Sequence, residues 1–301
     1  MAIEHLIIPA GGPNFFIYYG IIRQLYKKKI IINKNLKTIN ATSCGSIIAL
    51  LFLLHPNIKH LDNYLINRPW ENAFNLNIDK ILSYFDDNGL FDFNDIMEIF
   101  IPFFNLNNLD KYVTLKELYK ITNIEFNIYT TNFTLLKLEV INYKNNPDLS
   151  VVKAIHMSSA LPLLISPVYY NNNIYIDGAL FSSNPINNAI KDIIDLNLDT
   201  VLAFKLINKE NDLVIKNIFN YIITLLYKIS CIIDIDSRYN NNPIPNINNL
   251  IHVDHLNISD NAIWYNILYK KSYRKKYIKK GINIGKQFIK QYSQTDLSCL
   301  P

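Results

Sequence analysis

The stretch TINATSCGSIIALLFLL, residues 38–54, constrains the fold more than any other part of the chain. A short apolar approach leads through Thr42-Ser43-Cys44-Gly45 into an apolar helix start, which predicts a strand that turns sharply into a helix. Such a turn exposes one side chain beside the helix N-terminus, where backbone N–H groups favour developing negative charge. We therefore interpret Ser43 as a candidate nucleophile. An ordinary helix N-cap, in which Ser43 or Thr42 accepts a backbone N–H, stays open as the alternative.

The residues on either side of Ser43 are small, as a sharp strand-to-helix turn requires, because the two backbones nearly touch there. Gly45 lies two positions after Ser43, and Ala41 lies two positions before it, where the G-x-S-x-G pattern has glycine. Alanine is the next smallest residue, so we expect both positions to support the turn.

The chain around this turn predicts an α/β fold. Residues 3–8 are typical of a buried strand, and a glycine-rich loop at 10–14 leads into a helix over 15–29. A second strand near 37–41 and its following helix complete a strand-helix-strand-helix order, which favours a parallel sheet covered by helices. The further elements that we expect are a helical insertion over 57–121, strands at 125–131 and 134–141 joined by a tight turn at 132–133, a helix at 150–158, a hairpin over 169–176, a helix from 185, a strand at 199–205, a helix at 212–235, a loop at 239–249, a strand at 250–254, and helix over 259–291 with Gly281 and Gly285 as interruptions.

The length and composition favour a single domain. The chain has 301 residues, of which 50% are hydrophobic, so it can bury a sizeable core. Neither an internal repeat nor a linker divides it. We therefore predict one domain over 1–301, with its core at about 5–205 and a C-terminal helical part at about 206–295.

Three separated features suggest one site: the Gly11-Gly12 loop, Ser43, and Asp177 followed by Gly178. Together they resemble the patatin-like phospholipase family. In that family a glycine-rich loop forms the oxyanion hole, a G-x-S-x-G turn carries the nucleophile, and the Asp of D-G-[GA] completes a Ser-Asp dyad. The resemblance covers roughly residues 5–205, including the run AIHMSSALP before the Asp strand and Asn184-Pro185 after it.

The resemblance implies a three-layer α/β fold with a mainly parallel central sheet flanked by helices. It implies a lipid acyl hydrolase of the phospholipase A or lysophospholipase type, acting on a phospholipid or lysophospholipid. Ser43 would form an acyl-enzyme with Asp177 as general base and Gly178 letting the strand end bend, without metal or organic cofactor. A carboxylate with a pKa of about 4 is a weak base for a hydroxyl, so we expect a sparingly hydrated site.

The glycine-rich loop departs from the family pattern. The family has G-G-G-x-[RK]-G, whereas residues 10–15 are AGGPNF, without the basic residue. Pro13 has no N–H, so the expected oxyanion donors are Gly11, Gly12, Asn14 and the Cys44 amide. This departure leaves open a catalytically impaired lipid-binding protein on the same scaffold.

A Ser-His-Asp esterase is a further alternative. His252 and His255 follow Asp177 in the order Ser, Asp, His that some triad hydrolases use. Only one strand precedes the strand of Ser43, however, which is fewer than such hydrolases usually have. We therefore predict a structural role for His252.

The net charge of +5 is concentrated near the C-terminal end, where residues 270–280 interleave aromatic and basic side chains. One interpretation is peripheral contact with an anionic membrane surface. The other is a terminal helix with one buried stripe and a solvated basic face. The chain has no nucleic-acid motif, so we expect no nucleic-acid partner.

The cysteine count favours a reducing compartment, because Cys44, Cys231 and Cys299 are odd in number and show no paired spacing. The first residues carry Glu4 and His5 and lack a secretory apolar region. No segment reaches the roughly 18 uninterrupted apolar residues of a membrane-spanning helix. We therefore expect an intracellular protein, either cytoplasmic or peripherally associated with a membrane.

Overall fold

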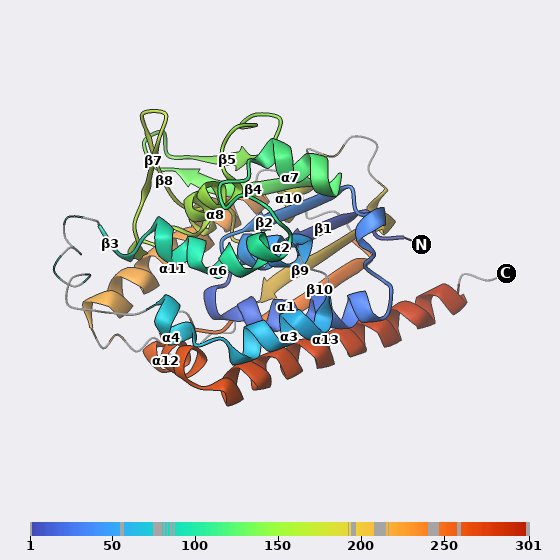
Figure 1. Cartoon of the computed structure of the whole chain (residues 1–301). Helices are drawn as coiled ribbons and strands as arrows, with labels where there is room; N and C mark the ends of the chain where they lie inside the picture. The colour runs from blue at the N-terminus through green and yellow to red at the C-terminus, as the bar shows by residue number, and fades with distance from the viewer. Residues whose placement is uncertain are drawn as a thin grey trace.

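A central sheet lies between helices on both of its faces, which gives a three-layer α/β architecture (Figure 1). In the computed structural model of the chain, the described residues are 2–54, 57–74, 80, 82, 84, 86, 88–191, 193, 197–207, 215, 217–239, 247–257 and 260–298. The predicted start of a helix at 212 and most of the predicted loop at 239–249 lie outside these residues.

The main sheet is mostly parallel, as predicted. Its strand order is β10-β9-β1-β2-β4-β8-β7, with β5 paired to β4. The parallel strands are β10 (Asn249–Asp254), β9 (Val201–Ile207), β1 (His5–Ile8), β2 (Thr38–Thr42) and β4 (Glu125–Asn132). The antiparallel strands are β5 (Lys137–Ile141), β7 (Val168–Tyr170) and β8 (Asn173–Asp177).

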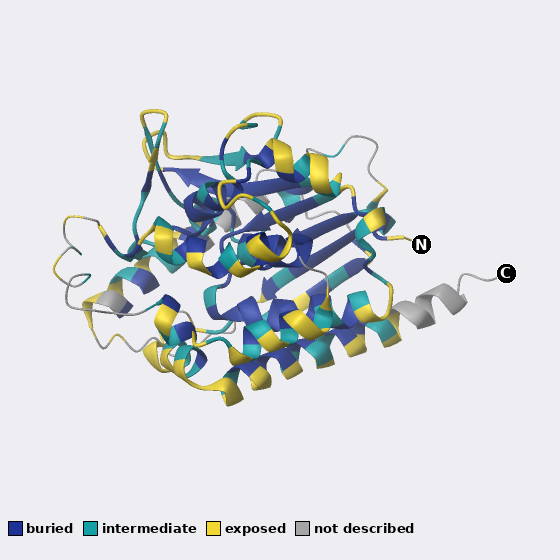
Figure 2. Ribbon diagram, viewed as in Figure 1, coloured by how far each residue is buried: buried dark blue, intermediate teal, exposed yellow. Residues whose placement is uncertain are grey.

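The helices of the structure are α1 (Phe15–Lys27), α2 (Cys44–Leu54), α3 (Ile58–Asn67), α4 (Trp70–Ala73), α6 (Phe93–Leu106), α7 (Leu115–Thr122), α8 (Val151–Ser159), α9 (Ala179–Ser182), α10 (Ile186–Lys191), α11 (Ile218–Tyr239), α12 (Asn261–Tyr269) and α13 (Lys271–Ser298). Short 3-10 turns lie at Gly12–Asn14, Asn33–Asn35 and Leu198–Thr200. Figure 2 shows the sheet strands as mostly buried and the outer helix faces as exposed.

Strand β1 shows why both faces of the sheet are covered. Successive side chains of a strand point to opposite faces. Leu6 and Ile8 belong to the larger apolar cluster, which includes residues of α1 and α2, whereas Ile7 belongs to a second cluster with Ile186 of α10. A strand that is apolar on both faces needs a helical layer on each side.

The insertion between α2 and β4 is not purely helical, in contrast to the prediction. It contains β3 (Gly89–Phe91), which pairs in parallel with β6 (Leu163–Ile165) to form a separate two-stranded sheet. The predicted tight turn at 132–133 is also wrong. Strand β4 continues to Asn132, whose side-chain oxygen accepts the Leu135 N–H at 3.0 Å and so shapes a longer turn.

Helix α13 runs along α1 without interruption, so the predicted breaks at Gly281 and Gly285 are wrong (Figure 1). A Cβ at Gly281 would lie 2.1 Å from the Ile17 carbonyl oxygen, and a Cβ at Gly20 would lie 2.2 Å from the Ile278 carbonyl oxygen. The facing glycines thus allow the two helix backbones to touch, since no side chain stands between them.

The sheet interleaves strands from distant parts of the chain, because β9 lies directly beside β1. On this ground we propose that residues 1–301 form a single domain, with a C-terminal part that adds β10 as well as helices. Among the described residues, none of the helices combines the length and the apolar composition needed to cross a bilayer.

Candidate active site

The strand register brings Ser43 and Asp177 together. Strand β4 lies between β2 and β8, with Thr42 paired to Tyr129 on one side and Asp177 paired to Thr130 on the other. The residue that follows β2 and the last residue of β8 therefore meet at the same place on the sheet. The Ser43 Oγ donates a hydrogen bond to Asp177 Oδ2 at 2.6 Å.

Ser43 has a backbone conformation that is rare for a residue with a side chain. Its φ is +53°, and α2 begins at the next residue. A serine held in this strained conformation between a strand and a helix is typical of a nucleophile elbow. The N-cap alternative does not hold, because the Ser43 hydroxyl donates to Asp177 and the buried Thr42 hydroxyl oxygen accepts no backbone N–H.

Gly45 and Ala41 lie where the turn needs small residues. A Cβ at Gly45 would lie 2.6 Å from the Pro9 carbonyl oxygen and 2.7 Å from that of Ile8. Ala41 is fully buried and pairs with Ile8 in the register of β1 and β2. The end of β1 therefore packs against the elbow too closely for a larger residue at position 45.

Ser158, at the end of α8, holds the elbow in place. The Ser43 N–H donates to Ser158 Oγ at 2.8 Å, and the Ser158 hydroxyl donates to the Tyr129 carbonyl oxygen at 2.6 Å. Sequence reasoning missed this role, although Ser158 lies in the run AIHMSSALP that supports the family resemblance. Ser159 lies next to it in the same run, and the sequence does not show which of the two serines supports the elbow.

Replacing Ser158 with alanine is expected to lower the free energy of unfolding by about 1–3 kcal/mol, because a buried N–H and a buried carbonyl would lose their partner. The matched control is Ser159→Ala, since Ser159 is also buried but donates only to the Ile155 carbonyl within its own helix. Urea-induced unfolding measures both. Equal losses for the two variants would contradict the role of Ser158 as the support of the elbow.

The Asp177 carboxylate is buried and accepts two hydrogen bonds. Its Oδ1 accepts the Ala179 N–H at 2.8 Å, while Oδ2 accepts the Ser43 hydroxyl. Burial raises the pKa of Asp177 to about 6, and the two hydrogen bonds oppose that increase. Gly178 is needed next to it because a Cβ there would lie 2.2 Å from the Tyr129 carbonyl oxygen. The result is a carboxylate that is charged at neutral pH and more basic than usual.

The glycine-rich loop lies beside Ser43. Gly11 and Gly12 have φ values of +150° and +48°, which favour glycine, and both line the same cavity as Ser43 and Cys44. Cys44 is the first residue of α2, and the first N–H groups of a helix have no acceptor within the helix. Three of the four expected donor residues thus line the same cavity as Ser43.

Asn14 is not placed to act as the fourth donor. Its backbone N–H donates to the Gly11 carbonyl at 3.0 Å, and the residue is fully buried. Its side chain instead binds the end of β10 and the residues after it, donating to the Asp254 carbonyl at 2.8 Å and accepting the Leu256 N–H at 2.9 Å. The Asn14 N–H is a donor within the 3-10 turn, and the sequence pattern does not show this turn.

The neighbouring thiol does not compete with the Ser43 hydroxyl as a nucleophile. Burial, together with the nearby charge of Asp177, raises the pKa of Cys44 well above its ordinary value. The thiolate is the reactive form of cysteine, so this side chain stays inert at neutral pH.

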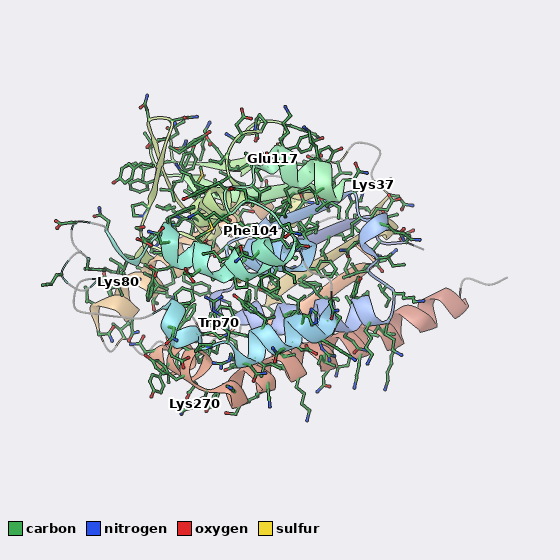
Figure 3. All side chains as sticks on the ribbon, viewed as in Figure 1. Lys37, Trp70, Lys80, Phe104, Glu117 and Lys270 are labelled. Carbon is green, nitrogen blue, oxygen red and sulfur yellow. The ribbon has the colours of Figure 1, made fainter. Side chains whose placement is uncertain are left out.

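A cavity of about 490 Å³ opens from Ser43 and Asp177. Its walls are mostly apolar and come from α1, α4, α6, α11 and α12 as well as from residues 161–165, which include β6. Trp70 of α4, labelled in Figure 3, packs edge-on against Phe15 and Phe16 in this wall. A pocket of this size and character suits an apolar ligand with a reactive polar end.

The histidines do not complete a triad. In a Ser-His-Asp site the imidazole lies between serine and aspartate, but here the two side chains touch directly. His252 is exposed on β10 and does not line the cavity, and its structural role stays a prediction. His255 lines the cavity and stacks on Tyr227 with ring centroids 5.4 Å apart, and burial lowers its pKa to about 4.

The basic run at 270–280 is divided between the interior and the surface. Arg274 is only 1% exposed, and its guanidinium donates to the carbonyl oxygens of Ile66, Ile267 and Leu268. Tyr277 is also buried. These two side chains are not available to a membrane. The run is a helix with a buried stripe and an exposed lysine face, and peripheral contact of that face with an anionic membrane stays a prediction.

Comparisons with known proteins agree with this geometry. The chain is 29% identical over 187 residues to "Probable lipid hydrolase 463L" of Invertebrate iridescent virus 6, covering 62% of this chain and 63% of that protein. It therefore spans less than two thirds of that relative's length. It is also 25% identical over 257 residues to "Uncharacterized protein R571" of Acanthamoeba polyphaga mimivirus, covering 79% of this chain and 80% of that one.

The solved structure of VipD from Legionella pneumophila has the same fold, with a TM-score of 0.56 at 16% identity over 97% of this chain and 67% of that chain. The family model described as "Patatin-like phospholipase" matches residues 6–190. This match covers more than half of the chain and includes both Ser43 and Asp177. The protein thus belongs to the patatin-like phospholipase family.

Proposed function

We propose that the protein is a lipid acyl hydrolase of the phospholipase A or lysophospholipase type, with Ser43 as nucleophile and Asp177 as general base. One observation carries the proposal: the hydroxyl of a positive-φ serine donates at 2.6 Å to a buried carboxylate. Membership of the patatin-like phospholipase family and the resemblance to a viral lipid hydrolase support it.

In the first half-reaction the Ser43 Oγ attacks the carbonyl carbon of a carboxylic ester while its proton passes to Asp177. The raised pKa of Asp177 makes this transfer less unfavourable than it would be for an ordinary aspartate. Collapse of the tetrahedral intermediate breaks the ester bond, and the leaving alcohol takes the proton from Asp177. An acyl group remains on Ser43.

In the second half-reaction Asp177 accepts a proton from water, which attacks the acyl carbonyl. The fatty acid leaves, and the proton returns to the Ser43 oxygen. A single carboxylate serves both steps, so no histidine is needed between the two side chains.

The negative charge on the carbonyl oxygen needs donors in both steps. We assign the backbone N–H groups of Gly11, Gly12 and Cys44 to this oxyanion hole, since these residues line the cavity around Ser43. The N-terminal end of α2 adds a favourable dipole at the same place. In this proposal the stabilisation comes from backbone N–H groups and the helix dipole, without the basic residue of the family loop.

The apolar cavity supports a substrate with a long acyl chain. Its volume of about 490 Å³ and its aromatic and aliphatic walls favour a fatty acyl group beside Ser43, with the polar part of the lipid towards the opening. Release of fatty acid from a phospholipid, a lysophospholipid and a triglyceride, assayed side by side, tests the proposal. Hydrolysis of the first or second class is expected. A folded protein that binds these lipids but hydrolyses none of them would favour the impaired lipid-binding alternative.

The pH profile offers a test of the base. Because burial raises the pKa of Asp177 to about 6, the ionised fraction and with it kcat/KM should fall about tenfold per pH unit below that value. Hydrolysis of a monomeric short-chain ester between about pH 4.5 and 8 gives the profile. Tryptophan fluorescence over the same range checks that the protein stays folded. A rate that holds constant down to about pH 4.5 would show that the base is a different, less buried group.

A further inference from the structure

Helix α11 turns its apolar side outward. Five of its exposed residues follow one another at spacings of three and four, so they form a single stripe along the helix. We call the following set the α11 stripe: Ile218, Tyr221, Leu225, Ile229 and Ile232, which are between 38% and 70% exposed.

The opposite face of α11 is buried but partly polar. Asn220, Thr224 and Ser230 all lie on the buried side, with Ile223 between them. A helix that only needs to cover a core in water has the reverse arrangement, with apolar residues inward and polar residues outward. The arrangement of α11 fits a helix whose outer face meets an apolar environment.

The α11 stripe lies next to the mouth of the cavity. Ile223, Leu226 and Tyr227 of the same helix line the cavity that contains Ser43. Tyr265 and Tyr269 of α12 also line it, and they are 55% and 52% exposed and stack with ring centroids 4.7 Å apart. Helices α11 and α12 lie at the same end of the molecule (Figure 1). Helix α11, which carries the stripe, and the exposed tyrosines of α12 therefore border the same cavity.

The lysines near this surface suit the phosphate groups of a lipid headgroup layer. Lys228 is exposed beside the stripe and is the only charged residue of the sequence between positions 218 and 233. Lys270, labelled in Figure 3, lies over the Tyr265 ring at 5.7 Å. Tyrosine rings with nearby lysines at the edge of an apolar face are typical of a protein surface at a membrane interface.

We propose that the α11 stripe, together with Tyr265 and Tyr269, rests on a lipid surface with the mouth of the cavity facing the lipid. An acyl chain then passes from the lipid layer into the cavity without crossing water. A protein bound to the same face would close the opening, which favours lipid over a protein partner. The inference rests on the proposed lipid acyl hydrolase function and adds the surface through which the substrate arrives. It also places the main membrane contact on α11 instead of on residues 270–280.

Sedimentation with phosphatidylcholine vesicles tests the surface. The variant is Leu225→Ser with Ile229→Ser, since both side chains are exposed and neither lines the cavity. The matched control is Ile121→Ser with Leu135→Ser, two residues that are each 55% exposed, on α7 and on the turn between β4 and β5. Vesicle binding is expected to weaken roughly tenfold or more for the stripe variant, since two apolar side chains no longer insert, and to stay unchanged for the control.

Two further measurements separate this surface from the chemistry and from effects on folding. Hydrolysis of a monomeric short-chain ester should be equal in the stripe variant and the unmodified protein, whereas hydrolysis of vesicle lipid should fall with the binding. If the unmodified protein hydrolyses no ester at all, the proposed function fails while vesicle binding still tests the surface. Independently, a Tyr221→Trp variant should show a blue shift of its fluorescence when vesicles are added.

Three results would overturn the inference. The first is equal vesicle binding by the stripe variant and its control. The second is an unchanged fluorescence of Tyr221→Trp with vesicles present. The third is a dimer in solution that the stripe variant converts to a monomer, because the α11 stripe would then be covered by a second copy of the chain.

Discussion

Replacing Ser43 with alanine is expected to lower the rate of ester hydrolysis by at least about 10³-fold and to abolish labelling by a fluorophosphonate probe. In the proposed mechanism the hydroxyl that donates to Asp177 forms the acyl-enzyme, and the neighbouring Cys44 thiol does not replace it, because burial raises the pKa of that thiol. Quantification of the labelled band and of released fatty acid gives the two readouts. Labelling that persists in Ser43→Ala would place the nucleophile elsewhere.

Asp177→Asn should lose activity to a similar extent while the protein becomes more stable at pH 7. Burial raises the pKa of Asp177 from 3.8 to about 6, so the neutral form is favoured in the folded state. The resulting contribution to stability is fully present below pH 3.8 and is lost as the pH rises through about 6. Removing the charge should therefore raise the free energy of unfolding at pH 7 by up to about 3 kcal/mol. Urea unfolding of both proteins at neutral and acidic pH measures this difference.

The control for both variants is His252→Ala, because His252 is exposed on β10 and does not line the cavity. Labelling and hydrolysis should stay as in the unmodified protein. A loss of labelling in this variant would revive the triad esterase. If Asp177→Asn instead has a lower free energy of unfolding at pH 7, the folded state stabilises the charged carboxylate, and the raised pKa of Asp177 is wrong.

Gly281→Val is expected to lower the free energy of unfolding by about 3 kcal/mol or more, which is the largest stability effect that we expect at a single position. Any Cβ at this position would overlap the Ile17 carbonyl oxygen at 2.1 Å, and backbone atoms cannot move aside as a flexible side chain does. Helices α1 and α13 would have to separate along their contact. Urea-induced unfolding followed by circular dichroism measures the change.

Gly285 provides the matched control, four residues further along the same face of α13. A Cβ at this position would meet the Gln24 side chain at 3.0 Å and no backbone atom closer than 3.5 Å. Gly285→Ala should therefore change stability by less than about 1 kcal/mol, because the gain in helix propensity offsets the tighter contact. Equal destabilisation by Gly281→Ala and Gly285→Ala would contradict a specific backbone contact between α1 and α13.

The pairing of Ser43 with Asp177 was expected from the resemblance to the family, to which the local pattern around each residue contributes. A serine between small residues and an aspartate before glycine mark sharp backbone turns, and turns depend on neighbours in the sequence. The mostly parallel sheet was predictable for the same reason, since alternating strands and helices favour it. What brings the two side chains within 2.6 Å is the register of β4, which depends on pairing over long distances.

The positions that escaped prediction are those whose partners lie far away along the chain. Ser158 supports the elbow across 115 positions, and Asn14 binds a segment 240 positions away. Arg274 looked like surface charge, yet its guanidinium donates to backbone carbonyls of two helices, α3 and α12. Gly281 looked like a helix break, because a sequence does not show which helix faces it. In each case the residue type suggested a local role, whereas the actual role is a contact with a segment far away in the sequence.

The pairing of β9 with β1 makes the segment after residue 190 part of the central sheet. The family match ends at residue 190, before β9, β10, α11 and α12. A fragment ending there would keep Ser43 and Asp177 but would leave β1 as an open sheet edge, which invites association with other chains. The later segment therefore cannot be exchanged as a separate module. Because it also builds the cavity wall and the α11 stripe, point changes in α11 and α12 would alter the wall of the cavity while Ser43 and Asp177 stay unchanged.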